Sequence, residues 1–252
     1  MLRRLLLPLS LLCALAFPAG AERIVLGLSQ DEVAITATFE GSDILIYGAV
    51  SRDAPVPSGD MGIIIAVSGP LEPVTVRRKE RKFGIWVNSD AVEVDAAPSF
   101  YAVATSAPFS DVLKDVEDLR HKISIPRAIR AVGTGVSDSE NFTEALIRVR
   151  ENADLYQVLE NTVSFEQGTL FGTAIALPAN LTEGTYSARI FLTRDGEVVD
   201  EYVTSIPVNK VGIERWLYEL AHNNAMLYGI MSLAIAIAAG WGASAAFAAL
   251  RR

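Results

Sequence analysis

The sequence predicts a mainly β protein: two small β-sandwich (Ig-like) bodies with intervening helices and one C-terminal transmembrane helix. Three observations lead to this prediction. Short apolar or alternating segments recur between turn residues roughly every 8 to 12 residues, which is typical of antiparallel sandwiches. Two stretches in the middle of the chain change to a helical period. A long segment near the C-terminus carries no charge.

Residues 1–21 have the three parts of a secretory signal peptide. A pair of arginines precedes a short apolar run at residues 5–17, and the sequence AGA at 19–21 fits the A-x-A cleavage pattern. An apolar run of about 13 residues is too short to cross a bilayer. The only cysteine, Cys13, lies inside this run. We therefore expect an exported chain without disulfides, thiolate metal ligands or a cysteine nucleophile.

The first β-sandwich is expected at residues 22–107. Apolar and polar residues alternate in the segments 35–39 and 44–47, and a turn separates the two segments, which predicts a hairpin. The apolar run MGIIIAV at 61–67 is suited to a strand buried on both faces. Further strands are expected at 74–76, 83–87, 92–94 and 100–103.

A helical connector is expected at residues 108–157. In it, 110–122 and 138–156 have apolar residues at helical spacing, and a Gly-rich stretch at 133–138 separates them. A second β-rich domain follows at 158–210. Its strands are expected at 169–177, 184–193 and 197–208, the last two joined by a tight Arg-Asp-Gly turn.

A juxtamembrane segment is expected at 211–225 and the transmembrane helix at 226–250. About 25 uncharged residues give roughly 37 Å of helix, enough to span the hydrocarbon core. The arginines at 251 and 252 are expected to stay in the cytoplasm by the positive-inside rule. Together with the signal peptide, this orientation places the body outside the cytoplasm.

The expected exported body is acidic. The chain has 22 basic and 30 acidic residues, and removing the four arginines at 3, 4, 251 and 252 leaves a net charge of −12. Such a surface repels phosphate backbones, so nucleic acid is excluded as a partner.

Catalytic motifs are sparse. The sequence contains no G-x-S-x-G, P-loop, G-x-G-x-x-G or H-E-x-x-H pattern, and we expect no cofactor and no metal. Glu117 and His121 lie four residues apart and could share a helix face, but no third or fourth ligand is near in sequence. The other histidine, His222, is expected at the membrane interface.

A basic cluster, RRKERK, precedes the apolar run 83–87, which we expect to be a buried strand. The cluster is expected at a hairpin tip or an exposed edge, where it would prevent edge-to-edge pairing. The alternative is a contact with an anion, a headgroup or an acidic partner. Its basic members are Arg77, Arg78, Lys79, Arg81 and Lys82.

The predicted transmembrane helix has a face of small residues four positions apart, which would let another helix approach closely. Its members are Ala234, Ala238, Gly242 and Ala246. An alanine-rich span also produces such spacing by chance.

The phrases FGIWVNSDAVEVDAAPSFYAVATS, FTEALIRVRENADLY, LPANLTEGTYSARIFLTRDGE and VNKVGIERWLYELAHNNAMLYG resemble the alphaproteobacterial putative transmembrane protein family. The resemblance runs from residue 24 into the last helix. It implies a bacterial inner-membrane protein with a periplasmic body, and it supplies no catalytic residues. It also implies an accessory role beside sulfite-exporter-type permeases, because genes of the family lie near theirs.

We therefore expect a non-enzymatic, membrane-anchored periplasmic protein that binds or scaffolds, beside an integral membrane partner such as a permease. One alternative is an envelope enzyme that uses carboxylates on the helix at 111–118. Another is a sensor or adhesion ectodomain, which is less favoured because only two residues follow the span.

Overall fold

The computed structural model describes residues 22–30, 32–36, 39–52, 58–130, 139–211 and 213–250. The predicted signal peptide, including Cys13, and the predicted boundary at 133–138 lie outside these residues. The described part of the chain is mainly β. Three sheets that include a curled half-barrel are joined by a few helices, and an apolar helix follows them.

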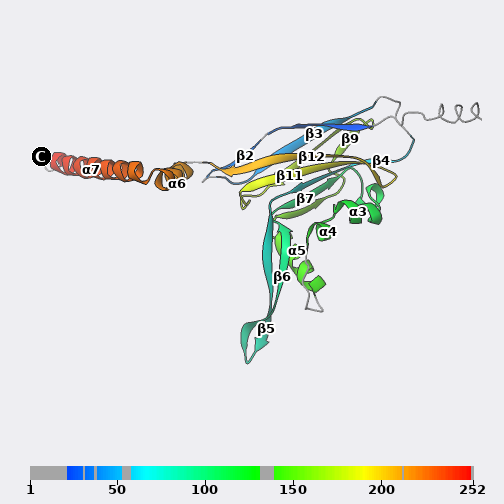
Figure 1. Ribbon diagram of the computed structural model, residues 1–252, viewed down its shortest axis with the longest axis horizontal. Coiled ribbons are helices and arrows are strands. Elements are labelled where there is room, and N and C mark those ends of the chain that lie inside the picture. The colour runs from blue at the N-terminus through cyan, green and yellow to red at the C-terminus, as the bar shows by residue number, and fades with distance from the viewer. Residues whose placement is uncertain are drawn as a thin grey trace, which may run out of the picture.

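The two larger sheets face each other (Figure 1). The six-stranded sheet has the order β2 (Val33–Ile35), β12 (Glu197–Lys210), β11 (Gly184–Arg194), β4 (Met61–Ser68), β7 (Tyr101–Thr105), β8 (Tyr156–Leu159). The four-stranded sheet has the order β1 (Arg23–Leu28), β3 (Ser42–Ser51), β10 (Leu170–Leu177), β9 (Ser164–Glu166). The third sheet is a long hairpin of β5 (Leu71–Lys82) and β6 (Ile85–Pro98).

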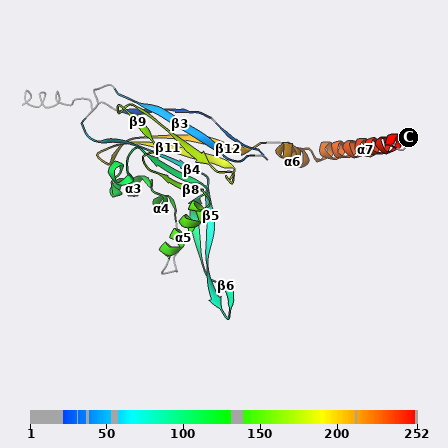
Figure 2. The same ribbon diagram turned by 180° about the vertical axis from the view of Figure 1, so that it is seen from behind.

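Strand β4 lies at the centre of the body. Ile63, Ile64 and Ile65 are consecutive and therefore point to both faces, yet all three are fully buried. The four-stranded sheet covers one face, and the helices after β7 cover the other (Figure 2). The prediction of a strand buried on both faces is confirmed.

The prediction of two separate sandwich bodies is wrong. Strands from residues 22–107 alternate with strands from 158–210 in both larger sheets: β3 pairs with β10, and β4 pairs with β11. One continuous core results, in which Ile46, Ile65, Ile175 and Ile190 all belong to the same cluster. Local alternation predicts that a segment is a strand, but its pairing partner depends on contacts far away in sequence.

The predicted hairpin of 35–39 and 44–47 is also wrong. Strand β2 pairs in parallel with the end of β12, with Ala34 opposite Asn209. Strand β3 pairs instead with β1, with Tyr47 opposite Gly27. A turn between two alternating segments is compatible with a hairpin, but here the segments go to different sheets.

The first predicted helix is interrupted. It consists of α2 (Phe109–Val112) and α3 (Asp115–His121), because Leu113 between them is extended, with φ −145° and ψ 127°. This conformation sends the Leu113 side chain into the core, where it is 3% exposed. Val116 and Leu119 are among the apolar residues whose helical spacing predicted this helix, yet both face solvent.

The remaining helices of the described residues are α4 (Ile125–Ala128), α5 (Ser139–Glu151), α6 (Ile213–Asn223) and α7 (Ala225–Leu250). Helix α5 confirms the second predicted helix and buries Phe142 and Leu146. The β11–β12 hairpin and its turn are confirmed; Asp195 and Gly196 have the positive φ angles of a type I′ turn. In α7, Ala225–Phe247 is long and apolar enough to cross a membrane, and none of it is buried by the chain.

Replacement of a β4 isoleucine tests the central position of this strand. We expect Ile65→Ala to lower the free energy of unfolding by about 2–5 kcal/mol, because it removes buried methylenes and leaves a cavity. Chemical unfolding of the detergent-solubilised chain measures the change. The matched control is Val203→Ala on β12, where 56% exposure predicts a loss below about 0.5 kcal/mol.

Buried tyrosines predict a loss of stability in alkali. The hydroxyl of Tyr156 donates to the Pro98 carbonyl at 2.8 Å. Burial raises the pKa of Tyr156 from 10.0 to about 12. Since the unfolded chain ionises first, the free energy of unfolding should fall between about pH 10 and 12, by up to about 1.4 kcal/mol per pH unit for this group. Tyr156→Phe should reduce the slope, and an unchanged slope would contradict the assignment.

Candidate interaction site

The β5–β6 hairpin projects from the body as a long arm (Figure 1). Its base is held by the core: Val94 belongs to the core cluster, and Val74 and Val76 pack against that cluster. Val92 is also buried. Helix α5 lies beside this part of the hairpin. Beyond the part that lies beside α5, the two strands continue to their last pair, Lys82 opposite Ile85. The side chains at this far end of the hairpin are exposed.

The turn at the end of the hairpin is formed by Phe83 and Gly84. Their φ angles are +51° and +84°, which define a two-residue type I′ turn. The first position of this turn favours Asn, Asp or Gly, and a bulky residue there costs on the order of 1 kcal/mol. The Phe83 side chain is fully exposed. The fold therefore holds an aromatic ring in water on a strained backbone.

The expectation that residues 83–87 form a buried strand is wrong. Ile85 is 64% exposed and Trp86 is 68% exposed, in addition to Phe83. The turn falls inside the apolar run instead of ahead of it, so the run lies at the tip, beyond the reach of the core. Period-2 alternation cannot show where a long hairpin leaves the body.

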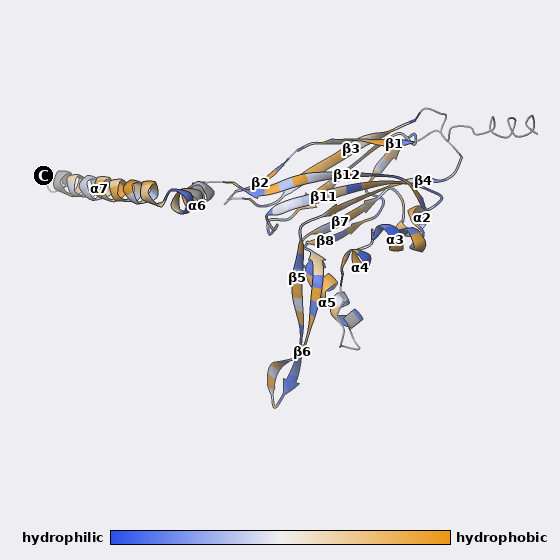
Figure 3. Cartoon of the chain, viewed as in Figure 1, coloured by the Kyte–Doolittle hydropathy of each residue, from blue (hydrophilic) through white to orange (hydrophobic). Residues whose placement is uncertain are grey.

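The basic cluster lies on β5 just before this turn, so its predicted position near a hairpin tip is confirmed. In Figure 3 this end of β5 is coloured hydrophilic. Arg78 has a structural contact: its guanidinium lies 4.6 Å from the centre of the Phe142 ring and 3.9 Å from the Asp90 carboxylate. Lys82 lies 3.5 Å from Glu80. The basic members other than Arg78 are all exposed: Arg77, Lys79, Arg81 and Lys82. Their role as a contact remains a prediction.

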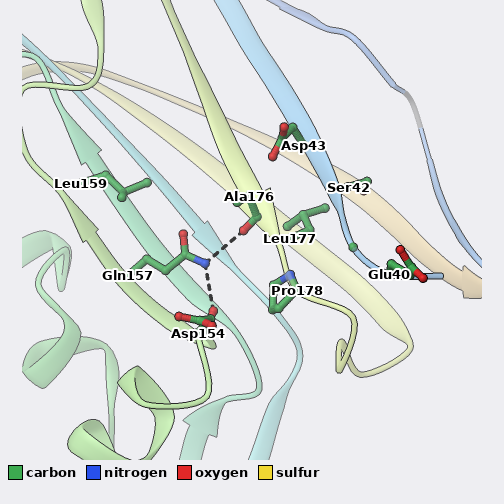
Figure 4. A pocket seen from close by; sticks show the side chains of 10 residues that line it. Glu40, Ser42, Asp43, Asp154, Gln157, Leu159, Ala176, Leu177 and Pro178 are labelled. Carbon is green, nitrogen blue, oxygen red and sulfur yellow. Dashed lines mark hydrogen bonds between the residues drawn. The ribbon is translucent and has the colours of Figure 1, made fainter.

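A pocket of about 600 Å³ opens where β3 begins and β10 ends (Figure 4). The Gln157 amide donates to the carbonyls of Asp154 and Ala176, which closes one wall. Carboxylates from Glu40, Asp43 and Asp154 line the pocket. Within the described residues, no three side chains are placed to hold a metal ion. The sequence did not predict this acidic pocket, because its walls come from distant segments.

Glu117 and His121 lie together, as their spacing predicts. The Nε2 atom of His121 is 3.6 Å from Glu117, and its Nδ1 atom is 3.3 Å from Glu201 of β12. Arg120 holds the other oxygen of Glu117 at 2.8 Å. The imidazole also lies edge-on against the ring of Phe191. Glu117 is buried and His121 is half-buried, so this group is a partly buried polar cluster between α3 and β12.

The groups beside this polar cluster stabilise the end of α3. Arg189 donates to the carbonyls of His121 and Lys122, at 2.8 Å and 3.0 Å, and satisfies acceptors that a helix end leaves unpaired. Tyr101 donates to the Ile123 carbonyl at 2.8 Å. Burial raises the pKa of Tyr101, and the nearby Arg189 charge opposes this shift. Tyr101 therefore acts as a hydrogen-bond donor that holds the segment after α3.

The candidate packing face lies on α7, where its four small residues are exposed. A Cβ added at Gly242 would meet open space, so the chain itself covers nothing there. His222 lies at the end of α6, stacked 4.0 Å from the ring of Tyr218. This arrangement is compatible with its predicted interfacial position.

Comparison with known proteins identifies one family. Residues 23–249 match the family described as "Putative transmembrane protein (Alph_Pro_TM)". No curated protein matches the chain.

Neutralising the basic cluster tests which of its members support the fold. We expect a variant with Gln at Arg77, Lys79, Arg81 and Lys82 to unfold within about 0.5 kcal/mol of the wild type, because these side chains are exposed. Arg78→Gln alone should cost about 1 kcal/mol, because it loses the Phe142 ring and the Asp90 carboxylate. Thermal unfolding compares the two variants. Equal losses would contradict the structural role of Arg78.

Proposed function

The chain belongs to the family described as "Putative transmembrane protein (Alph_Pro_TM)", and on this premise we propose that it is a membrane-anchored periplasmic protein that binds or scaffolds an integral membrane partner, such as a permease. The observation that carries the proposal is α7. Over Ala225–Phe247 this helix has no charge, and the body covers none of it. A helix of this composition and length is stable in lipid.

The proposed setting is the bacterial inner membrane, with the N-terminal body in the periplasm and the C-terminus in the cytoplasm. The signal-like pattern of residues 1–21 and the arginines after α7 support this orientation.

The proposed partner contact lies on the small-residue face of α7. Apolar burial does not drive helices together in lipid, and small side chains that allow close backbone approach are the usual means of association. Ala238 and Gly242 lie near the centre of this face; Ala238 is exposed, and a Cβ added at Gly242 would meet open space. An integral membrane helix is the partner that fits such a face.

The alternative of an envelope enzyme keeps one specific observation in its favour, which is the imidazole of His121 between the carboxylates of Glu117 and Glu201. A Glu117→Gln, His121→Asn double variant tests it. If the cellular phenotype of a deletion strain is fully restored by this variant, the enzyme hypothesis is wrong.

Site-specific crosslinking in cells tests the scaffold proposal. A photo-crosslinking amino acid at Ala238 is expected to capture one reproducible membrane protein, identified by mass spectrometry. The matched control is the same amino acid at Ala236, which lies about 160° around the helix because successive residues turn by about 100°. Capture from Ala236 alone, or no capture from either site, would contradict the proposed face.

A further inference from the structure

The tip of the β5–β6 hairpin combines apolar and basic side chains. Phe83, Ile85 and Trp86 are all more than half exposed. They adjoin the exposed basic residues Arg81 and Lys82. Apolar and aromatic groups framed by basic ones match the boundary between lipid headgroups and acyl chains, where the rings enter the apolar layer and the cations meet phosphates.

Charge is divided along the hairpin. Between Val76 and Asn88 the sequence has five basic residues and only one acidic residue, Glu80. Asp90 on β6 lies opposite Arg78, and nearer the body the acidic residues Glu93 and Asp95 follow. Since the whole chain carries a net charge of −8, an anionic surface repels most of the molecule and attracts this end. The charge distribution therefore orients the tip toward anionic lipid.

The backbone of the turn supports an external contact. Phe83 occupies a left-handed conformation at the position where Asn, Asp or Gly is favoured, and its ring gains no contact with the body in return. Strain of this kind persists at ligand contacts and switches. When the tip docks, the Phe83 ring leaves water, and the free energy gained by this transfer offsets the cost of the strained backbone.

We propose that the hairpin tip docks on anionic phospholipid headgroups of the membrane that holds α7, with Phe83, Ile85 and Trp86 inserted at the headgroup boundary. This inference rests on one part of the proposed function, namely that α7 spans the membrane. Anchoring keeps the tip close to that surface at all times, so a weak contact is sufficient. Each basic residue near an anionic surface strengthens binding by roughly fivefold.

The arrangement of the arm suits this contact. The hairpin leaves the body from the half nearer α6 and runs crosswise to the line of α6 and α7 (Figures 1 and 2). When the body leans toward the bilayer about its connection to α6, the tip is the part that meets the surface. Attachment at α7 and at the tip together sets the orientation of the body, which a single helix leaves free.

A fluorescent label at the tip tests the proposal in the full chain. Cys13→Ser removes the only cysteine, and Ile85→Cys then carries a nitrobenzoxadiazole label. The protein is reconstituted into phosphatidylcholine vesicles with or without phosphatidylglycerol. With phosphatidylglycerol we expect a blue shift, a several-fold rise in emission and quenching by brominated acyl chains. A label at Thr75→Cys, exposed on β5 but far from the turn, should show none of these changes.

Two variants separate the contributions of the basic and the apolar tip residues to lipid docking. Arg81→Glu with Lys82→Glu should abolish the phosphatidylglycerol-dependent signal. Phe83→Asn with Trp86→Ser should abolish the quenching, and Asn at position 83 suits the turn, so the variant should fold. Retention of the signal by either variant would overturn the proposal.

Other outcomes are equally decisive. No quenching in either vesicle overturns lipid docking, and quenching that is equal in both overturns the role of anionic headgroups. A signal that arises only when a membrane protein partner is co-reconstituted shows that the tip binds protein instead of lipid. Flotation of the same vesicles reports on α7 separately: a chain that floats without tip quenching disproves this inference alone, whereas a chain that does not float disproves the anchor.

Discussion

Burial of strand β4 on both faces is the constraint on which the rest of the body depends. Its three consecutive isoleucines are shielded from water only if one layer covers each side of the sheet. The four-stranded sheet supplies one layer, and the segment containing α2, α3 and α4 supplies the other. The strand also needs a hydrogen-bonded neighbour on each edge, which β7 and β11 provide. These requirements bring the two halves of the chain into one core.

Two parts of the chain leave this core, in different directions and with different chemistry. Helix α7 is apolar on all sides and suits lipid. The β5–β6 hairpin is anchored by valines at its base and loses that support toward its tip, where Phe83 and Trp86 meet water. The proposed membrane anchor uses α7 alone, and the proposed lipid contact uses the hairpin tip together with α7.

Much of the local structure could be predicted, because its causes are local. The uncharged segment of α7, the alternation of β10 and β11 and the Asp195–Gly196 turn depend on residues that are neighbours in sequence. The break at Leu113 could not be predicted, since it depends on where the core offers a site for that side chain. The exposure of Phe83 could not be predicted either: an apolar run appears the same in sequence whether it reaches the core or extends beyond it.

The sequence by itself determined the mainly β class, the strand that is buried on both faces, the candidate span and the basic cluster with its place near a hairpin tip. Periodicity, charge and turn residues are sufficient for these features. Only the tertiary structure decided that the strands of the two halves share their sheets, that Glu201 lies beside His121, and that the apolar run at 83–87 is exposed. Each of these features depends on contacts between residues that are distant in sequence, or on how far along the hairpin the core covers the side chains. The local sequence pattern contains neither kind of information.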